Sequence, residues 1–286
     1  MSLMAPTAPP RARPGLRASL ALNLRATIAR GYVRVVGSMR EPSWIIGDAV
    51  LPGLGMMAYV LLYRALGAPK SFEALAVVGG MLSNYWLNVL WGMGAQFYWE
   101  KQQGQLQLYF AAPCSRMAIL TGMALGGIAM TTSRSLFGFF IGFVVLGVRV
   151  PPFDVGMLLL VFVVTMAALY ALGMTLSSLF LLYGREAWHV CNAMSEPVYF
   201  LSGLYFPLRA LGALGAVVAG VVPLGLGVDA LRQVLLGPSA HGLLPVRTET
   251  LLLVGIAILC LFLARLSLGY LEWLSKREGR LTQRWQ

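Results

Sequence analysis

Two charged side chains lie midway along long apolar runs of this 286-residue sequence, where a charge needs either a partner or a chemical task. Arg134 lies midway along the run that follows Arg116, and Glu196 stands beside Pro197 in a later run. An isolated charge in an apolar medium costs several kcal/mol, so we expect both side chains to face the protein interior. Two interpretations stay open: a structural ion pair, or contact with a substrate or gate.

A polar stripe is predicted on one face of the run 72–97. Asn84, Asn88, Trp91 and Ala95 recur at steps of three and four residues, which places them on one side of a helix. Amides and an indole suit either hydrogen bonds between helices or the path of an amphiphilic substrate. The candidate pathway residues are therefore Asn84, Asn88, Trp91, Arg134 and Glu196.

Sequence motifs for chemistry within this chain are missing. There is no GxxxxGK[ST] phosphate loop, no HExxH and no GxSxG. Cys114, Cys191 and Cys260 are far apart, and His189 beside Cys191 has no second ligand pair, so neither a disulfide nor a metal is expected. We predict no enzyme activity and no cofactor in this chain, and any uphill work must draw energy from a partner or an ion gradient.

The composition points to a membrane. Hydrophobic residues make up 58% of the chain and charged residues only 12%, against roughly 25% charged in soluble domains. The mean hydropathy is +0.73. The net charge of +11 does not indicate a nucleic-acid partner, because the basic residues gather at the flanks of the apolar region. They are Arg11, Arg13, Arg17, Arg25, Arg30, Arg34 and Arg40 before it, and Lys276, Arg277, Arg280 and Arg284 after it.

The apolar runs predict an all-α polytopic membrane protein with six transmembrane helices, since a crossing needs about 20 apolar residues. Proline and glycine separate the runs, as at Pro113 and at Pro151. The six predicted spans are 44–66, 72–97, one within 116–148, 155–183, 187–206 and 250–270.

One stretch is too short to cross. Residues 208–222 and 224–236 flank Pro223, and we interpret them as a re-entrant helical hairpin, within an outer hairpin of residues 207–237. Six spans with both termini cytoplasmic place fourteen basic residues inside and six outside, in agreement with the positive-inside rule. A seventh crossing would put the basic tail, residues 273–286, outside.

The region before the first span has two parts. Residues 5–14 are rich in proline, and the polar stretch of some forty residues is too long for a signal peptide. Between Leu20 and Met39, apolar residues recur at steps of three and four, and polar ones fall opposite. This pattern favours an amphipathic helix in the cytoplasmic interface, the alternative being a solvated tail. We therefore divide the chain into a lead and interfacial helix, 1–42, a membrane domain, 43–272, and the basic tail.

The loop between the second and third spans combines polar and apolar residues over 99–116. Its start is too polar for the membrane core, yet Leu106, Leu108, Tyr109 and Phe110 are apolar. A short helix with such residues exposed would need a groove on a soluble subunit to cover it. The alternative is a loop that rests on lipid.

Three passages carry a family resemblance. The loop resembles the segment before the third span in the type 2 branch of ATP-binding-cassette exporter permeases, which includes drug-resistance and lipo-oligosaccharide exporters. The passage 200–207, FLSGLYFP, is similar to that family's motif at the end of the fifth span, and Pro223 with the later DALR at 229–232 is similar to its motif before the last span. The loop residues that match in order are Glu100, Gly104, Leu106, Leu108, Pro113, Ser115 and Arg116.

The resemblance implies a two-part machine in the plasma membrane of a bacterium. Two permeases pair, as a homodimer or a heterodimer, and each sits on a cytosolic ATPase subunit that binds ATP and magnesium. The loop would be a coupling helix within 99–113, seated in a groove of the ATPase. Its coupling residues would be Glu100, Gly104, Leu106, Leu108, Tyr109 and Phe110.

The leading hypothesis is a permease that exports an amphiphilic substrate, such as a drug in multidrug resistance or a lipid-linked product. A polysaccharide or lipo-oligosaccharide exporter is the alternative within transport, although the aromatic residues form no evident ladder. Two other classes stay open: an intramembrane enzyme that modifies lipids, which would need catalytic groups gathered at one depth, and a membrane anchor for a sensor ATPase.

Overall fold

The structure is a computed structural model that describes residues 16–40, 42–183, 186–240 and 242–278. All regular elements in these residues are helices, as predicted. The proline-rich lead up to residue 15 and the tail from residue 279 lie outside the described residues. The helices are α1 Leu16–Met39, α2 Pro42–Ala65, α3 Lys70–Leu87, η1 Asn88–Gly94, α4 Gln96–Gln102, α5 Leu106–Ala111, α6 Arg116–Phe140, η2 Ile141–Val145, α7 Val155–Tyr183, α8 Glu186–Leu201, η3 Leu208–Leu211, α9 Gly212–Val221, α10 Pro223–Leu236, η4 Gly237–Ala240 and α11 Val246–Glu278.

Four helical stretches are long and apolar enough to cross a membrane, and they confirm four of the predicted spans. They are Lys70–Gln102, Arg116–Val145, Val155–Phe180 and Val246–Leu271. The second span continues from α3 through η1, a π-helix, into α4 without a break in the helical path. The predicted fourth span, 155–183, coincides with α7.

The other two predicted spans differ in length. Helix α2 covers the predicted first span, but its apolar part within the described side chains is Val50–Ala65. Helix α8 has 16 residues and ends at Leu201 rather than at Phe206. It stops there because Gly203 adopts a left-handed φ of 58°, and the carbonyl oxygens of the following segment accept hydrogen bonds from the side chain of Arg232. Six crossings therefore remain a prediction.

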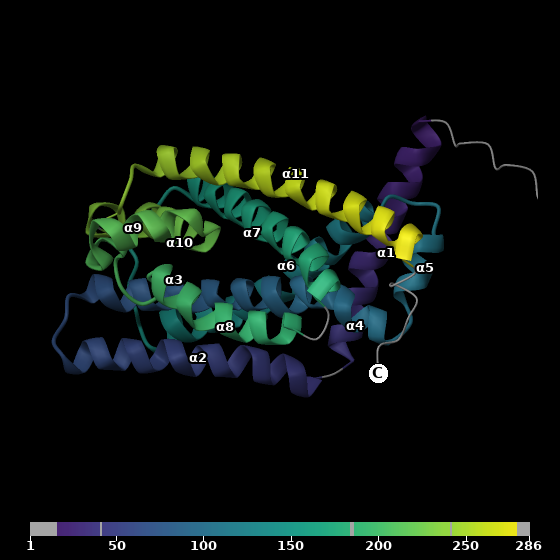
Figure 1. Cartoon of the computed structure of the whole chain (residues 1–286). Coiled ribbons are helices and arrows are strands. Elements are labelled where there is room, and N and C mark those ends of the chain that lie inside the picture. Colours follow the sequence, from purple (N-terminus) through teal and green to yellow (C-terminus); the bar gives the residue numbers. More distant parts are fainter. Residues whose placement is uncertain (1–15, 41, 184–185, 241, 279–286) are drawn as a thin grey trace, which may run out of the picture.

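The long helices run between two ends of the molecule (Figure 1). One end carries α1, α4, α5 and the described end of α11, and we call it the α5 end. The opposite end carries α9 and α10 with the connections α2–α3 and η2–α7, and we call it the α10 end. Helix α11 packs along α7, and α6 packs on α3 and α1, so the helices form one body.

Helix α1 turns its polar face towards the protein. The Thr27 hydroxyl donates to the Ala118 carbonyl oxygen over 3.0 Å, and the Ser115 amide donates to Asn23 Oδ1 over 2.8 Å. Gly122 allows the close approach of α1 to α6, because a Cβ there would lie 2.4 Å from the Thr27 carbonyl oxygen. Most of the apolar side chains that predicted the helix point outwards and are exposed, namely Leu20, Leu24, Ile28, Tyr32 and Met39, whereas Val35 is half-buried. An outward apolar face suits contact with lipid.

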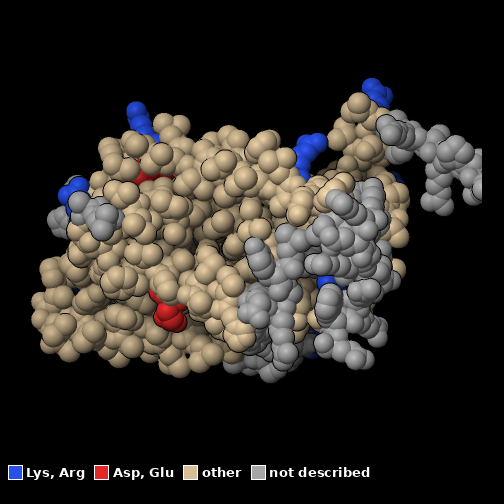
Figure 2. All heavy atoms as spheres, viewed as in Figure 1, with Lys and Arg blue, Asp and Glu red and all other residues tan. Residues whose placement is uncertain are grey.

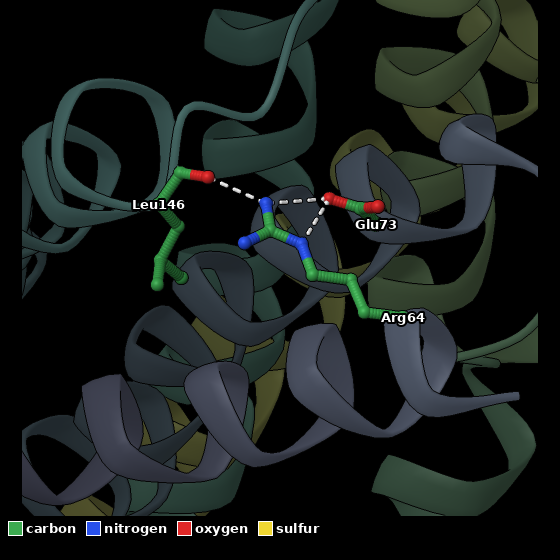
Figure 3. A network of polar contacts seen from close by, with 3 residues as sticks. All are labelled: Arg64, Glu73 and Leu146. Carbon is green, nitrogen blue, oxygen red and sulfur yellow. Dashed lines mark hydrogen bonds and ion pairs between the residues drawn. The ribbon is translucent and has the colours of Figure 1, made fainter. Parts of the chain in front are cut away.

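A polar network joins three elements at the α10 end (Figure 3). Arg64 at the end of α2 donates from Nε and Nη2 to Glu73 Oε2 in α3, over 2.9 and 2.8 Å. The same Nη2 also donates to the carbonyl oxygen of Leu146, just after η2. One guanidinium thus holds three helix ends together, as its planar fork of donors permits.

Two short helices, α9 and α10, lie on either side of the Val222–Pro223 step, in the stretch where a re-entrant hairpin is predicted. Pro223 begins α10, where its missing N–H leaves no unmet donor. Helix α10 is buried against α3, α7 and α11, whereas α9 leaves Val217 and Val221 exposed. Because of this burial, α10 is an internal support of the bundle. Re-entry of the hairpin into a membrane stays a prediction.

Candidate functional site

The loop at the α5 end folds into two short helices. Helix α4 ends at Gln102, and α5 begins at Leu106. Between them the Gln105 amide donates to the Glu100 carbonyl oxygen over 2.9 Å, and Gly104 adopts a φ of 75°. This left-handed conformation favours glycine, which has no Cβ to clash. The coupling segment predicted within 99–113 is therefore a helix, a tight turn and a second helix.

Glu100 anchors this turn from the inside. Its side chain is 2% exposed and forms an ion pair with Arg30 of α1, and Gln96 Nε2 donates to Glu100 Oε1 over 3.0 Å. A buried carboxylate without a cation would be strongly unfavourable. The pair ties α4 to α1, two elements about seventy residues apart in the sequence.

Arg30 also covers the ring of Tyr109. Its guanidinium carbon lies 5.2 Å from the ring centroid, within the range of a cation–π contact. Removal from water lowers the pKa of Arg30 and raises the pKa of Tyr109. Arg30 is thus the residue at which α1, α4 and α5 meet. Sequence reasoning placed it on the polar face of an amphipathic helix, and the partners were missed because they lie far away in sequence.

The two leucines of α5 have opposite environments. Leu106 is 2% exposed and packs into the core, whereas Leu108 is 69% exposed. The side chain of Phe110 lies outside the described residues. Leu106 therefore fixes α5 to the membrane domain, and Leu108 offers an apolar surface at the α5 end.

The stripe on the second span faces other helices. Asn84 Nδ2 lies 3.5 Å from Ser135 Oγ in α6, and the Tyr170 hydroxyl in α7 donates to Asn88 Oδ1 over 2.9 Å. Trp91 is partly buried and packs against the same core. In this state of the chain the amides make bonds between helices, which is one of the two roles that the sequence left open.

Arg134 and Glu196 do not form an ion pair with each other. Arg134 is half-buried and donates from Nη2 to Ser38 Oγ of α1 over 3.2 Å. Glu196 is exposed on α8. Both lie within helices, but Arg134 faces α1 and Glu196 lies on the exposed side of α8, so neither neutralises the charge of the other.

Two of the motifs noted in the sequence meet at the α10 end. Arg232 in α10 is 0% exposed and donates to the carbonyl oxygens of Gly203, Leu204 and Phe206, which follow α8, and of Leu75 in α3. Only a guanidinium carries enough donors in a fixed fork for such a set of acceptors. The charge count above placed Arg232 among the outer basic residues. The structure shows it buried instead, where it joins α10 to α3 and to the segment after α8, and we call it the brace. The two motifs that carry the family resemblance, SGLYF and DALR, hold the residues that meet here.

Beside this brace lies a second polar group that sequence reasoning missed. Gln233 Nε2 donates to Glu249 Oε2 over 3.0 Å and approaches Asp229 Oδ2 at 3.4 Å. The Leu243 amide donates to Asp229 Oδ2 over 2.6 Å. Asp229 and Glu249 are both buried, so this network joins α10 to the start of α11.

Apolar helices of spanning length, with polar groups turned inwards, define a multi-pass membrane protein. The family model described as ABC-2 type transporter matches residues 33–236, and the chain therefore belongs to that family. It is a permease component of an ABC exporter, and permeases of this family generally work with a cytosolic ATPase partner that hydrolyses the ATP. No curated protein matches the chain closely enough to count as a relative.

Proposed function

We propose that this permease exports an amphiphilic substrate, drug-like or lipid-linked, and that a separate cytosolic ATPase drives it through α5. The observation that carries the proposal is the contrast between Leu106 and Leu108. An apolar side chain held outwards on a firmly anchored short helix is what a groove on another subunit would accept. The ion pair of Glu100 and Arg30 supports this helix from the protein side, and we call the pair the mount of α5.

The proposed topology has six crossings with the α5 end in the cytoplasm of a bacterium. Helix α1 and the described end of α11 both lie at that end, which suits an even number of crossings (Figure 1). Arg25 and Arg40 are exposed on or beside α1, as the positive-inside rule favours. Two such permeases pair, identical or different, and the substrate passes between them.

Force from the ATPase would move α5 as a unit with its mount. Because Arg30 joins α1, α4 and α5, a push on Leu108 reaches α1 through the contact of Tyr109 with Arg30. It then reaches the second span through the ion pair of Arg30 with Glu100 in α4, which continues from η1. A π-helix such as η1 is a weak point in a long helix and is a natural place for a change of packing. Two packed states that differ by a few kcal/mol suffice for alternating access.

A single substitution tests this proposal in the complex of permease and ATPase. We expect Leu108→Asp to abolish the stimulation of ATP hydrolysis by the permease, and we expect Leu108→Cys to crosslink to the ATPase. The matched control is Leu66→Asp, a leucine of similar exposure between α2 and α3, at the α10 end. Normal hydrolysis and export with Leu108→Asp, together with no crosslink from Leu108→Cys, would overturn the proposal.

A further inference from the structure

Two arginines on the inward face of α1 differ in whether they have a partner. Arg30 pairs with Glu100, whereas Arg34, one helical turn further on, makes no hydrogen bond or ion pair with the described residues. The surroundings are apolar: on the face drawn in Figure 2, charged atoms are few and scattered over an otherwise uncharged surface. A cation without a counterion is unfavourable among apolar helices, so Arg34 needs a ligand.

Two glycines make room for the side chain of Arg34. A Cβ on Gly126 of α6 would lie 3.1 Å from Arg34 Cβ and 3.2 Å from Arg34 Cδ, so the stem passes directly over this glycine. At the other end of the side chain, a Cβ on Gly92 of η1 would overlap with Arg34 Nη2. The side chain thus extends from α1 across α6 to the π-helix of the second span, and its guanidinium occupies space that only a glycine leaves free.

A second hydrogen-bond donor lies beside this guanidinium. Asn88 Nδ2 would lie 2.9 Å from the same Cβ on Gly92, next to Arg34 Nη2. Asn88 Oδ1 already accepts the hydrogen bond from the Tyr170 hydroxyl, and the amide carries no charge, so Asn88 does not neutralise Arg34. Both Arg34 and Asn88 are half-buried, which leaves them within reach of a ligand. A guanidinium beside an amide nitrogen suits the oxygens of a phosphate group.

Positive charge is in excess where α1, α6 and η1 meet. Arg134 of α6 donates to Ser38 Oγ over 3.2 Å, one turn beyond Arg34 on α1. The ion pairs printed for the described side chains join Arg30 to Glu100 at this end and use no carboxylate beside Arg34. An anion is the ligand that balances this charge.

The ligand also has apolar groups to contact, because the outward face of α1 is apolar. Leu24, Ile28 and Tyr32 are 61, 62 and 67% exposed on that face. We infer that Arg34 and Asn88, with the added charge of Arg134, bind the phosphate group of an anionic lipid whose acyl chains lie along α1. Basic groups between helices near a membrane surface recognise such head groups. The inference involves neither the ATPase nor the transported substrate.

The test uses the full chain in detergent, without ATP or ATPase, and follows thermal unfolding as lipid is added, since a ligand of the folded state raises the unfolding temperature. We expect phosphatidylglycerol to stabilise the wild type and zwitterionic phosphatidylcholine to do so far less. Arg34→Met should weaken the apparent affinity for phosphatidylglycerol at least about tenfold, through loss of the charge. Arg25→Met is the matched control, because it removes the same charge from an exposed position on α1 and should bind as the wild type does.

A further variant leaves every charge in place. Gly92→Ala puts a methyl group where the guanidinium lies, and it should weaken phosphatidylglycerol binding about as much as Arg34→Met does. Without added lipid, Arg34→Met should unfold at the temperature of the wild type or higher, because it removes a charge that no described residue pairs. A lower unfolding temperature would show that Arg34 is paired within the protein, and would overturn the inference.

The other outcomes are equally decisive. Equal affinity of the wild type and Arg34→Met for phosphatidylglycerol overturns the inference, as does equal stabilisation by the two lipids. Stabilisation by inorganic phosphate at concentrations as low as those of phosphatidylglycerol also overturns it, since a free anion rather than a lipid would then be the ligand. The Leu108 crosslink is independent of all these results and tests the coupling alone.

Discussion

The two ends of the bundle each depend on one arginine that faces the protein interior, and the two arginines are used differently. At the α5 end, Arg30 contacts side chains: the Glu100 carboxylate and the Tyr109 ring. At the α10 end, Arg232 contacts backbone carbonyl oxygens from α3 and from the segment after α8. Side chains can change partners by rotation, whereas backbone carbonyls move only with their helices. Under the proposed function, we therefore expect the α5 end to shift as a unit and the α10 end to stay fixed.

The strongest test of this contrast is removal of the brace. We expect Arg232→Met to destabilise the permease by about 3–5 kcal/mol, because several buried carbonyl oxygens lose their donors and Asp229 loses a nearby cation. Thermal unfolding in detergent measures it. Arg209→Met, at an exposed arginine near the same end, should change stability by less than about 0.5 kcal/mol. Equal stability of the two variants would remove the distinction between the ends.

The pair of leucines on α5 sharpens the comparison. Leu106→Ala should cost about 2–4 kcal/mol of stability, because it leaves a cavity under α5. Leu108→Ala should cost less than about 0.5 kcal/mol, as an exposed substitution does, yet it should reduce stimulation of the ATPase. Unfolding and hydrolysis are measured on the same preparations. A stability loss from Leu108→Ala as large as that from Leu106→Ala would contradict the assigned environments.

A double-mutant cycle measures the interaction energy between Arg30 and Glu100, the mount of α5. Arg30→Met and Glu100→Leu each leave a buried charge alone, so each should destabilise, and the double variant should be more stable than the sum of the two losses predicts. We expect a coupling energy of about 1–3 kcal/mol from thermal unfolding. All three variants should also lose coupling to the ATPase. Additive losses would show that the ion pair does not join α1 to α4.

The smallest expected effect concerns the bond between η1 and α7. Tyr170→Phe removes the donor to Asn88 Oδ1 and should cost about 0.6 kcal/mol, the average for hydrogen bonds between membrane helices. Tyr63→Phe removes another tyrosine hydrogen bond, at the α10 end, and serves for comparison. If η1 is a place where packing changes, Tyr170→Phe alters transport and Tyr63→Phe does not. A transport assay in proteoliposomes distinguishes the two.

The sequence alone predicted much of the architecture. Four spans, the loop helix after Gly104, the amphipathic helix and the break at Pro223 all follow from hydropathy, periodicity and the special backbone geometry of glycine and proline. These properties are local, so a window of some twenty residues contains the information. The family followed from short motifs that keep their order along the chain.

Tertiary structure decided which way each side chain faces and with what it pairs. Hydropathy did not separate Leu106 from Leu108, and the charge count took Arg232 for an outer surface residue. Arg134 and Glu196 were candidates for a pair, but Arg134 contacts Ser38, and Glu196 is exposed on α8. Contacts between residues about thirty to one hundred and sixty positions apart depend on how the helices pack, and no local pattern in the chain encodes that packing.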